Sequence, residues 1–358
     1  MEKKIKILFI LPSLRPGGAE RVVSFIAQHL DKTKFEPKLL IVGYEKKAVY
    51  SFDNIETVFL NKSRVLFGIF GIFKNINKFK PDIVMTSIAH LTMVTVLQSY
   101  FFRKTKFVSR EANIKKVSRQ YHNEMPSTLG NILNNLSYKL LDLVICQSKD
   151  MASELIDSHP KLEQKITIVN NPITKVYSSE INMPELTKPH YITVGRLHEE
   201  KGHCRILLAL SQLDYDFNYT IIGKGIYKAN IVDKANLLSI MDKITWIDFT
   251  DKVQEYLIDS SVFIQGSFAE GFPNALLESC AVGTPAIAYN CLGGTSEIID
   301  NGINGFLVDS ENELKNRLIE LKVNPIDRRQ IITSVMKKFS PEQIITQYEK
   351  AFTNLVKY

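Results

Sequence analysis

Cysteine is scarce in this sequence and follows no pattern. Four occur in 358 residues, with neither metal-ligand nor paired spacing: Cys146, Cys204, Cys280 and Cys291. This excludes a disulfide-stapled secreted domain, and Cys146 and Cys280 lie in apolar runs, as small core residues do in a reducing compartment. No apolar run is long enough to span a bilayer, and the run over residues 5–11 is too short for a secretory signal. We therefore expect a cytoplasmic protein.

Two further kinds of site are missing. The loop with Gly17 and Gly18, which follows the first apolar run, lacks the G-x-G-x-x-G pattern of dinucleotide-binding loops. No cluster of His, Cys and Asp suggests a metal site. Asp214 and Asp216 lie between a predicted helix and a predicted strand, so we interpret them as part of a solvated turn. We expect neither a metal ion nor a bound cofactor.

What is present is the composition of a globular protein with an uneven charge. Apolar residues make up 45% of the chain and charged residues 23%, and the length suits two α/β domains. The net charge is +7, yet residues 1–180 hold 27 Lys and Arg against 16 Asp and Glu, while residues 181–358 hold 18 against 22. A basic first half indicates a polyanionic partner, either an anionic membrane surface or nucleic acid.

Apolar runs alternate with helical patterns along the chain, which predicts parallel α/β layers. The predicted strands are residues 5–11, 38–42, 82–86, 106–109, 141–146, 191–197, 219–223, 244–249, 261–264 and 284–289, and the first helix is predicted over 21–30. The polar segment 174–189 has no apolar period and is the best linker candidate. We predict doubly wound, Rossmann-like domains over residues 1–180 and 181–340, then a helix over 341–358.

The stretch 266–301 holds the densest pattern of polar and glycine residues. Glu270 and Glu278 flank GFPNALL, which follows a short buried strand and starts a helix in whose first turn Pro273 fits. Both carboxylates can then face one cleft. Gly293 and Gly294 precede another predicted helix, where free backbone N–H groups would form an anion site.

Three strings resemble motifs of a known family. They are EGFPNALLE at residues 270–278, GGAER at 17–21, and G-R-x-x-x-x-K-G at 195–202. They are similar to motifs of the retaining, nucleotide-sugar-dependent glycosyltransferases of family 4, including enzymes of bacterial cell-envelope polysaccharides. The resemblance implies the GT-B fold, in which two Rossmann-like domains face a cleft and a C-terminal helix returns to the first domain.

The resemblance also implies how a donor is held. Arg196 and Lys201 would clamp the diphosphate, Glu270 would hold sugar hydroxyls, and these three are the catalytic candidates. Glu278 would accept hydrogen bonds from the ribose. Because Arg196 and Lys201 neutralise the leaving group, no divalent metal is required. The other donor-binding residues that it implies are Gly17, Gly18, Gly195, Gly223, Phe272, Pro273, Asn274, Ala275, Gly294 and Thr295.

The first half offers candidates for the sugar or the acceptor. The polar loop Arg110, Glu111 and Asn113 follows a predicted strand, where the family often places groups facing the transferred sugar. Many members have a histidine there, but this chain has Ala112, so we assign no catalytic histidine in the loop. His90 is the other candidate, with a structural role as its alternative. In the second half Asp248 stands where the family usually has glycine, near the nucleotide base.

Two basic and aromatic segments are candidates for a membrane surface or an acceptor phosphate. Residues 64–80, with Arg64 and Lys74, form either an interfacial helix or an ordinary core-packed helix. Residues 101–106, with Arg103, Lys104 and Lys106, could hold phospholipid headgroups or a lipid-linked pyrophosphate, or be a solvated face.

Three functions remain open at this point. The first is a metal-independent, retaining glycosyltransferase at the inner face of the cytoplasmic membrane. It would move a hexose or N-acetylhexosamine from a nucleotide-diphosphate sugar, UDP in preference to GDP, to a polyprenyl-pyrophosphate-linked or other envelope glycan such as O-antigen or capsule. The second is a nucleotide-sugar epimerase or hydrolase on the same fold. The third is a nucleic-acid-binding protein, suggested by a pI near 9.0 but lacking a recognition motif, so we expect no nucleic acid as partner.

Overall fold

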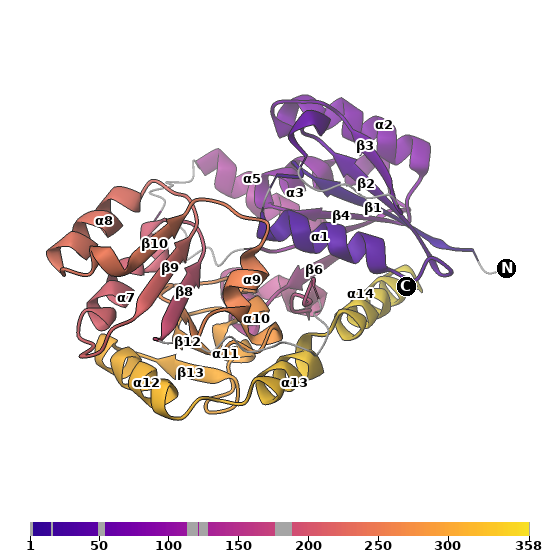
Figure 1. Ribbon diagram of the computed structural model, residues 1–358. Coiled ribbons are helices and arrows are strands. Elements are labelled where there is room, and N and C mark those ends of the chain that lie inside the picture. The colour runs from indigo at the N-terminus through magenta and orange to yellow at the C-terminus, as the bar shows by residue number, and fades with distance from the viewer. Residues whose placement is uncertain are drawn as a thin grey trace. The chain divides into compact units, whose positions relative to one another are not determined.

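The computed structural model of the chain describes residues 3–15, 17–48, 54–112, 121, 128–175 and 188–357 (Figure 1). The chain divides into two compact units. The first comprises Met1–Asn113, Glu124–Thr174 and Pro341–Tyr358, and the second Ile114–Asn123 and Lys175–Ser340. The boundary predicted after residue 180 lies outside the described residues.

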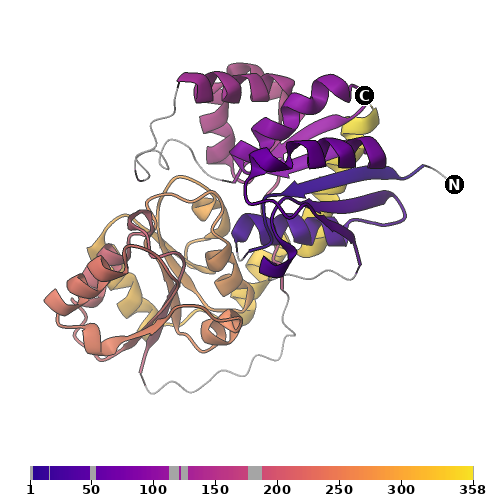
Figure 2. The same cartoon turned by 90° about the horizontal axis from the view of Figure 1, so that it is seen from above.

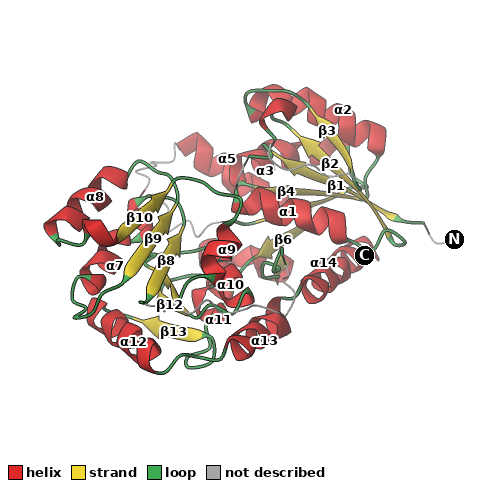
Figure 3. Cartoon of the chain, viewed as in Figure 1, coloured by secondary structure: helices red, strands yellow, loops and turns green. Residues whose placement is uncertain are grey.

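The first unit is built on a seven-stranded parallel sheet (Figure 3). The strand order is β3-β2-β1-β4-β5-β6-β7. The strands are β1 Ile5–Leu11, β2 Phe35–Ile41, β3 Glu56–Phe59, β4 Ile83–Ser87, β5 Lys106–Arg110, β6 Leu143–Cys146 and β7 Ile166–Ile168. Pairs such as Leu11 with Ile41 in β2 and Ile10 with Thr86 in β4 align the carboxyl ends of the central strands at one edge.

Helices cover both faces of this sheet. They are α1 Gly18–His29, α2 Ile69–Phe79, α3 Ala89–Val96, α5 Thr128–Leu140, α6 Lys149–Ser158 and α14 Pro341–Lys357, with the 3-10 helices η1 Glu45–Lys47, η2 Val65–Gly68, η3 Leu97–Phe101 and η4 Pro160–Lys165. Alternate residues of β1, Ile7, Phe9 and Leu11, pack in one core with α1 and α14. Leu8 and Ile10 are equally buried and point to the opposite side, where α2 and α3 lie (Figures 1 and 2).

The C-terminal helix α14 belongs to the first unit, as the resemblance implied. Ile344, Ile345, Tyr348 and Phe352 join the core on β1 and β2. The Phe352 ring meets those of Phe9 and Phe35 edge to face, with centroids 6.3 and 6.5 Å apart. The predicted helix over 341–358 and its return to the first domain are confirmed.

The second unit repeats the plan with six parallel strands in the order β10-β9-β8-β11-β12-β13. The strands are β8 His190–Val194, β9 Asn218–Ile222, β10 Ile244–Ile247, β11 Val262–Gln265, β12 Ala286–Tyr289 and β13 Gly305–Val308. The helices are α7 His203–Leu210, α8 Lys228–Leu237, α9 Val253–Ile258, α10 Asn274–Ala281, α11 Thr295–Ile298, α12 Glu311–Val323 and α13 Arg328–Phe339, with η5 Glu199–Lys201 and η6 Met241–Lys243. α7, α8 and α12 pack on one face of the sheet, and α9, α10 and α13 lie on the other (Figure 1).

Both sheets reverse their strand order at one point, between β1 and β4 in the first unit and between β8 and β11 in the second. Doubly wound sheets bind ligands outside the carboxyl ends of the strands at such a switch point. In the second unit the loops that leave this point begin at Gly195 and at Gly266. These loops carry the three predicted catalytic residues, Arg196, Lys201 and Glu270.

The predicted α/β class and the doubly wound sheets are confirmed, and the ends of the predicted strands are confirmed within three residues. β6, β8, β10 and β12 are each two residues shorter than predicted, and β3, β7 and β13 were not predicted. The first helix begins at Gly18, three residues before its predicted start. Pro273 is the N-cap of α10, one position before the first turn in which it was expected.

Candidate functional site

Two loops of the second unit lie against each other at the switch point. The N–H of Phe268, in the loop after β11, donates to the carbonyl of Glu200, in the loop after β8, at 2.9 Å. Gly202 has φ +60°, and a β-carbon there would overlap the carbonyl oxygen of Gly266. Only glycine therefore allows both the turn and the close approach.

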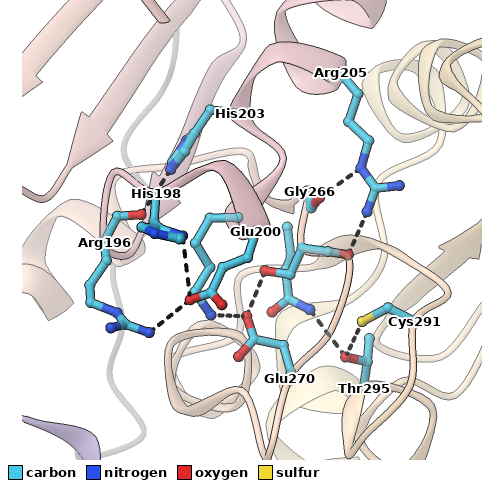
Figure 4. Close-up of polar contacts among 12 residues, drawn as sticks. Arg196, His198, Glu200, His203, Arg205, Gly266, Glu270, Cys291 and Thr295 are labelled. Carbon is cyan, nitrogen blue, oxygen red and sulfur yellow. Dashed lines mark hydrogen bonds and ion pairs between the residues drawn. The ribbon is translucent and has the colours of Figure 1, made fainter. Parts of the chain in front are cut away.

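An ion pair joins the same two loops. Lys201 Nζ donates to Glu270 Oε1 at 2.7 Å, and the two side chains are only 18% and 14% exposed (Figure 4). Ser267 Oγ donates to the same oxygen at 2.5 Å. Glu270 is thus a carboxylate held in one orientation by two donors, one of them charged. Two of the three predicted catalytic residues are brought together.

The third predicted catalytic residue, Arg196, has a different partner. Its Nη2 donates to Glu200 Oε1 at 2.8 Å, and His198 Nδ1 lies 4.0 Å from that oxygen (Figure 4). The Arg196 side chain is 66% exposed. Arg196 and Lys201 therefore each pair with a separate carboxylate here, instead of converging on one anion as expected.

His203, at the start of α7, contacts the backbone of the loop that carries Arg196. Its Nε2 lies 3.2 Å from the carbonyl oxygen of Arg196, so the proton of the neutral ring is on Nε2. Burial lowers the pKa of His203 to about 4, and the nearby charge of Lys201 adds to this, against the opposing effect of the hydrogen bond to Arg196. His203 is therefore a neutral donor that fixes a backbone carbonyl.

Arg205, in the first turn of α7, holds the loop after β11 by hydrogen bonds. Its Nε donates to the carbonyl of Gly266 at 2.6 Å, and its Nη2 donates to that of Ser267. The guanidinium lies between two rings, 4.0 Å from the centroid of Phe268 and 3.6 Å from that of Tyr289. Figure 4 shows Arg205 reaching from its helix to the backbone that leads to Glu270.

The turn before α11 differs from the expected anion site. The N–H of Gly294 donates to the carbonyl of Gly271 at 3.1 Å, so it is not free, and α11 is a single turn. The Thr295 hydroxyl is fully buried, accepts from Gln265 Nε2 at 3.1 Å and lies 3.4 Å from Cys291 Sγ. Burial raises the pKa of the Cys291 thiol to about 11. Contact from Thr295 to a donor would have to come through its main chain.

Some of the remaining predicted donor residues are buried and pack in the unit, and others are partly exposed. Phe272 and Pro273 are buried, and the Phe272 ring packs on Phe339 of α13 with centroids 5.5 Å apart. Asn274 and Ala275 at the start of α10 are partly exposed, and Glu278 on the same helix is buried.

Glycines of the second unit also divide into two kinds. A β-carbon on Gly223 would overlap the carbonyl oxygen of Gly195, so Gly223 serves close packing. Around Gly195, apart from its two chain neighbours, no heavy atom of the described residues lies within 4 Å of where a β-carbon would be. Near the predicted base contact, Asp248 instead pairs with Lys228 at 3.0 Å and Lys224 at 3.9 Å, and the Lys228 hydrogen bond lowers the pKa of Asp248. Asp216 pairs with Lys188 and Lys243 in an exposed turn, as interpreted from the sequence.

In the first unit Arg110 requires a correction. It is 1% exposed, its Nε donates to Tyr348 Oη of α14 at 3.1 Å, and its Nη2 donates to Asn171 Oδ1. Arg110 is thus a core residue that ties β5 to α14, and its side chain is out of reach of an acceptor. The neighbouring Glu111 is buried and accepts from Ser109 Oγ at 3.0 Å. Asn113 lies outside the described residues.

The other predicted residues of the first unit lie at its switch-point edge. Gly17 is the N-cap of α1 and Gly18 its first residue. His90 is the second residue of α3, and its side chain is exposed on the wall of a pocket of about 630 Å³. Partial desolvation lowers the pKa of His90.

The two basic and aromatic segments form one surface. The Phe73 ring of α2 lies 5.7 Å from that of Phe101 and 4.9 Å from that of Phe102. α2 buries Ile72 and Ile76, while the opposite side exposes large apolar groups. We call the exposed group formed by Leu66, Phe67, Phe70, Phe73, Tyr100 and Phe101 the aromatic patch.

Basic residues lie close to the aromatic patch in the sequence. Arg64, Lys74, Arg103 and Lys104 are all exposed. Lys106 is an exception, because its ammonium pairs with Asp142 at 3.4 Å and supports the sheet. None of the helices in the described part of the chain has the length and hydropathy to cross a bilayer. The same residues contain no group of three or more His, Cys, Asp or Glu suited to a metal ion.

Comparisons with known families decide the identity. Residues 16–175 match the family model described as Glycosyltransferase Family 4, and residues 178–338 match that described as Glycosyl transferases group 1. The chain belongs to the family 4 glycosyltransferases. The matches cover both units of this glycosyltransferase, so the family predicted from three short strings is confirmed.

Bacterial relatives extend over most of the glycosyltransferase. One from Campylobacter jejuni is named N-acetylgalactosamine-N,N'-diacetylbacillosaminyl-diphospho-undecaprenol 4-alpha-N-acetylgalactosaminyltransferase. It is 24% identical over 321 residues, covering 86% of this chain and 87% of the relative. The O-antigen biosynthesis glycosyltransferase WclY of Escherichia coli is 22% identical over 364 residues, covering 98% and 99%.

Solved structures agree on the GT-B fold. HepE of Anabaena, solved in complex with UDP, is 17% identical, with a TM-score of 0.79 over 98% of this chain and 100% of that one. Sucrose-phosphate synthase of Thermosynechococcus elongatus is 16% identical, with a TM-score of 0.83 over 98% and 99%.

Sequence reasoning missed several residues of the glycosyltransferase site. Arg205 and Ser267 hold the Glu270 loop, Glu200 pairs with Arg196, and His203 fixes the Arg196 carbonyl. Ser267 is the second residue after the end of β11, and a position just after a strand is a signal for a site residue. Arg205 gives no comparable signal, because a basic residue in the first turn of a helix is usually solvated.

Proposed function

We propose that this glycosyltransferase moves a hexose or N-acetylhexosamine from a UDP-sugar to a lipid-linked envelope glycan, with retention of anomeric configuration and without a metal ion. The observation that carries this proposal is the buried pair of Lys201 and Glu270 at the switch point of the second unit. It places a cation and an oriented carboxylate side by side, which is what a departing diphosphate and a sugar ring require.

The donor diphosphate would be neutralised by Lys201 and Arg196. The Arg196 side chain is largely exposed, so a diphosphate can reach its guanidinium and would compete for it with the Glu200 carboxylate. The open space at Gly195 allows the phosphate to approach the backbone. Two cations on the leaving group remove the need for a divalent metal.

Glu270 would hold the sugar. Within the described residues both protein donors, Lys201 and Ser267, reach Oε1, which leaves Oε2 to accept from a sugar hydroxyl. The carboxylate also lies where positive charge grows on the ring as the leaving group departs. Glu278, buried on α10, would accept from the ribose.

The acceptor would be a lipid-linked glycan met at a membrane surface. Two Campylobacter jejuni relatives carry undecaprenol-linked acceptors in their names. The aromatic patch supports this, since Phe70 is 87% exposed and Arg64, Lys74, Arg103 and Lys104 suit anionic lipid. We infer a peripheral protein on the inner face of the cytoplasmic membrane.

Donor turnover tests the transferase. UDP- and GDP-sugars are scanned for nucleotide release with membrane extract as acceptor source, with and without EDTA, on wild type and Glu270→Gln. We expect UDP release from one donor, unchanged by EDTA and lowered about a hundredfold or more in the variant. Loss of turnover in EDTA would refute metal independence, and an epimerised or merely hydrolysed donor would favour the other enzyme class. NMR of the product's anomeric proton reads retention directly.

Vesicle flotation tests the membrane surface. Phe67→Ser/Phe70→Ser should reduce recovery with phosphatidylglycerol vesicles severalfold, because two exposed aromatic side chains no longer enter the interface. Ile226→Ser, an equally exposed apolar side chain in the second unit, serves as the matched control. Equal recovery of the two variants would contradict membrane contact through the aromatic patch.

A further inference from the structure

A basic pocket of about 630 Å³ lies in the first unit, apart from the donor residues of the second. Its walls come from the loops after β1, β2 and β3 and from the first turns of α3, elements seen together in Figure 1. The polar side chains used below are Ser13, Arg15, Lys47, Lys62, Arg64 and His90. The volume is that of a small-molecule site.

Among the described residues, the charged side chains that line the pocket are all of one sign. They are Arg15, Lys47, Lys62 and Arg64, and none of the described lining residues is Asp or Glu. Within the described part of the chain none of these four side chains has a carboxylate partner, whereas Arg196, Lys201 and Lys106 are all paired. Four cations around one pocket leave a positive field that an anion with several oxygens would neutralise.

The loops that form the pocket are fixed to one another. The N–H of Gly43 donates to the carbonyl of Pro12 at 2.9 Å, and that of Lys62 to Val42 at 2.8 Å. At the N-cap of α3, Ile88 has φ +87°, which is strained for a β-branched residue. The Thr92 hydroxyl binds the Ile88 carbonyl at 3.2 Å and holds this conformation. This strained residue lies two positions before His90, which lines the pocket, and backbone strain often occurs beside ligand sites.

The pocket opens beside the aromatic patch. Leu66 lines the pocket and is itself 62% exposed, and Phe67 and Phe70 follow it in η2 and α2. Anionic and apolar parts of one ligand would therefore find their partners next to each other. A free nucleotide or a soluble sugar phosphate would leave the apolar part of this surface in water.

We propose that this pocket binds the diphosphate group of a polyprenyl-type lipid, with Arg15, Lys47, Lys62 and Arg64 on the phosphate oxygens and the Leu66–Phe70 segment against the start of the lipid chain. The inference rests on the proposed function only in taking a lipid-linked acceptor. Ser13 and His90 face the same space and would contact the first sugar. No bond is made or broken at this pocket.

Direct binding to the full chain tests the proposal. The probe is farnesyl diphosphate, followed by titration calorimetry, with farnesol and inorganic pyrophosphate as its two halves. We expect farnesyl diphosphate to bind at least tenfold more tightly than either half. Lys47→Gln and Arg64→Gln should each weaken it about tenfold, the effect of one charge-assisted hydrogen bond.

The chain offers a matched control for Lys47. Lys46 is the preceding residue of the same η1 helix, is equally exposed and does not line the pocket. Lys46→Gln should bind within twofold of wild type. Equal binding by Lys46→Gln and Lys47→Gln, or no binding by wild type, would overturn the proposal.

One further measurement distinguishes a lipid diphosphate from a phospholipid headgroup. A second distinguishes failure of the pocket proposal from failure of the transferase proposal. Competition by phosphatidylglycerol vesicles as strong as that by farnesyl diphosphate would assign the pocket to a lipid headgroup and overturn the diphosphate. UDP binding and donor turnover by the wild type test the proposed donor site of the second unit. If these fail while Lys47→Gln still loses farnesyl diphosphate, the pocket stands and the transferase proposal fails.

Discussion

Lys201 Nζ and Glu270 Oε1 are 2.7 Å apart across 69 residues of chain, and this contact joins the loops after β8 and β11. Each residue orients the other, so neither acts alone. The cation that we propose for the leaving group and the carboxylate that we propose for the sugar are thereby placed by a single interaction.

Replacing these two residues should give non-additive losses. Lys201→Ala removes a leaving-group charge and also frees Glu270, so we expect turnover to fall about a thousandfold, and Glu270→Gln about a hundredfold. The double variant should be little worse than Lys201→Ala. Steady-state kcat and KM for the UDP-sugar measure this, and a double variant at the product of the two losses would show that the residues act independently.

Arg205 should act as a positioning residue. Lysine cannot donate to both the Gly266 and Ser267 carbonyls while lying between Phe268 and Tyr289, so Arg205→Lys lets the Glu270 loop shift. We expect kcat to fall about ten- to a hundredfold with KM nearly unchanged.

Arg328 provides the matched control for that prediction. It is a half-buried arginine of the same unit that donates to two other backbone carbonyls, those of Ile258 and Ser260. Arg328→Lys should lower stability but leave kcat within about twofold. Similar kcat losses in both variants would mean that Arg205 serves the fold of the unit and not Glu270.

Gly293 should tolerate no side chain. Its φ is +121°, and a β-carbon would overlap the carbonyl oxygen of Glu270, so Gly293→Ala forces the loop to move. We expect the free energy of unfolding of the second unit to fall by more than about 3 kcal/mol and turnover to be lost. Gly302→Ala is the control, because φ is +77° but the space is open, and it should cost only about 1 kcal/mol. Trp246 of β10, the single tryptophan, reports this unfolding by fluorescence.

His203 should make the second unit less stable in acid. Burial lowers its folded-state pKa to about 4 from an ordinary value near 6.5. As pH falls through this window the unfolded chain takes up a proton that the folded unit does not, so up to about 3 kcal/mol of stability is lost between pH 6.5 and 4. Urea unfolding followed by Trp246 should show this slope in wild type and a shallower one in His203→Gln. Identical slopes would assign the acid sensitivity to other groups.

Sequence reasoning succeeded where a short string determines the local structure. The run 5–11 is β1 to the residue. Glu270 and Lys201 meet because they lie in the loops after the adjacent strands β11 and β8, whose carboxyl ends are aligned. The partner of Arg196 was not predictable. Both Glu200 and the donor phosphate that we propose are suitable partners for this guanidinium, and the structure shows that Glu200 holds it here.

Arg110 shows how one residue of strand length changes a role. The loop was expected to begin at this residue, but β5 includes it. Successive side chains of a strand point to opposite faces, so the extra residue turns the guanidinium toward α14 and Asn171. No local pattern in the sequence reveals that the far C-terminal Tyr348 completes its environment.

Because α14 belongs to the core of the first unit, that core is completed only after the end of the chain has been synthesised. Chains emerge from the ribosome from the N-terminus, and domains usually fold as they appear. Here the apolar face of β1 and β2 lacks the contacts of α14 until Ile344, Tyr348 and Phe352 have been synthesised, which happens after the whole second unit. The unit that begins the chain is therefore the last to complete its core.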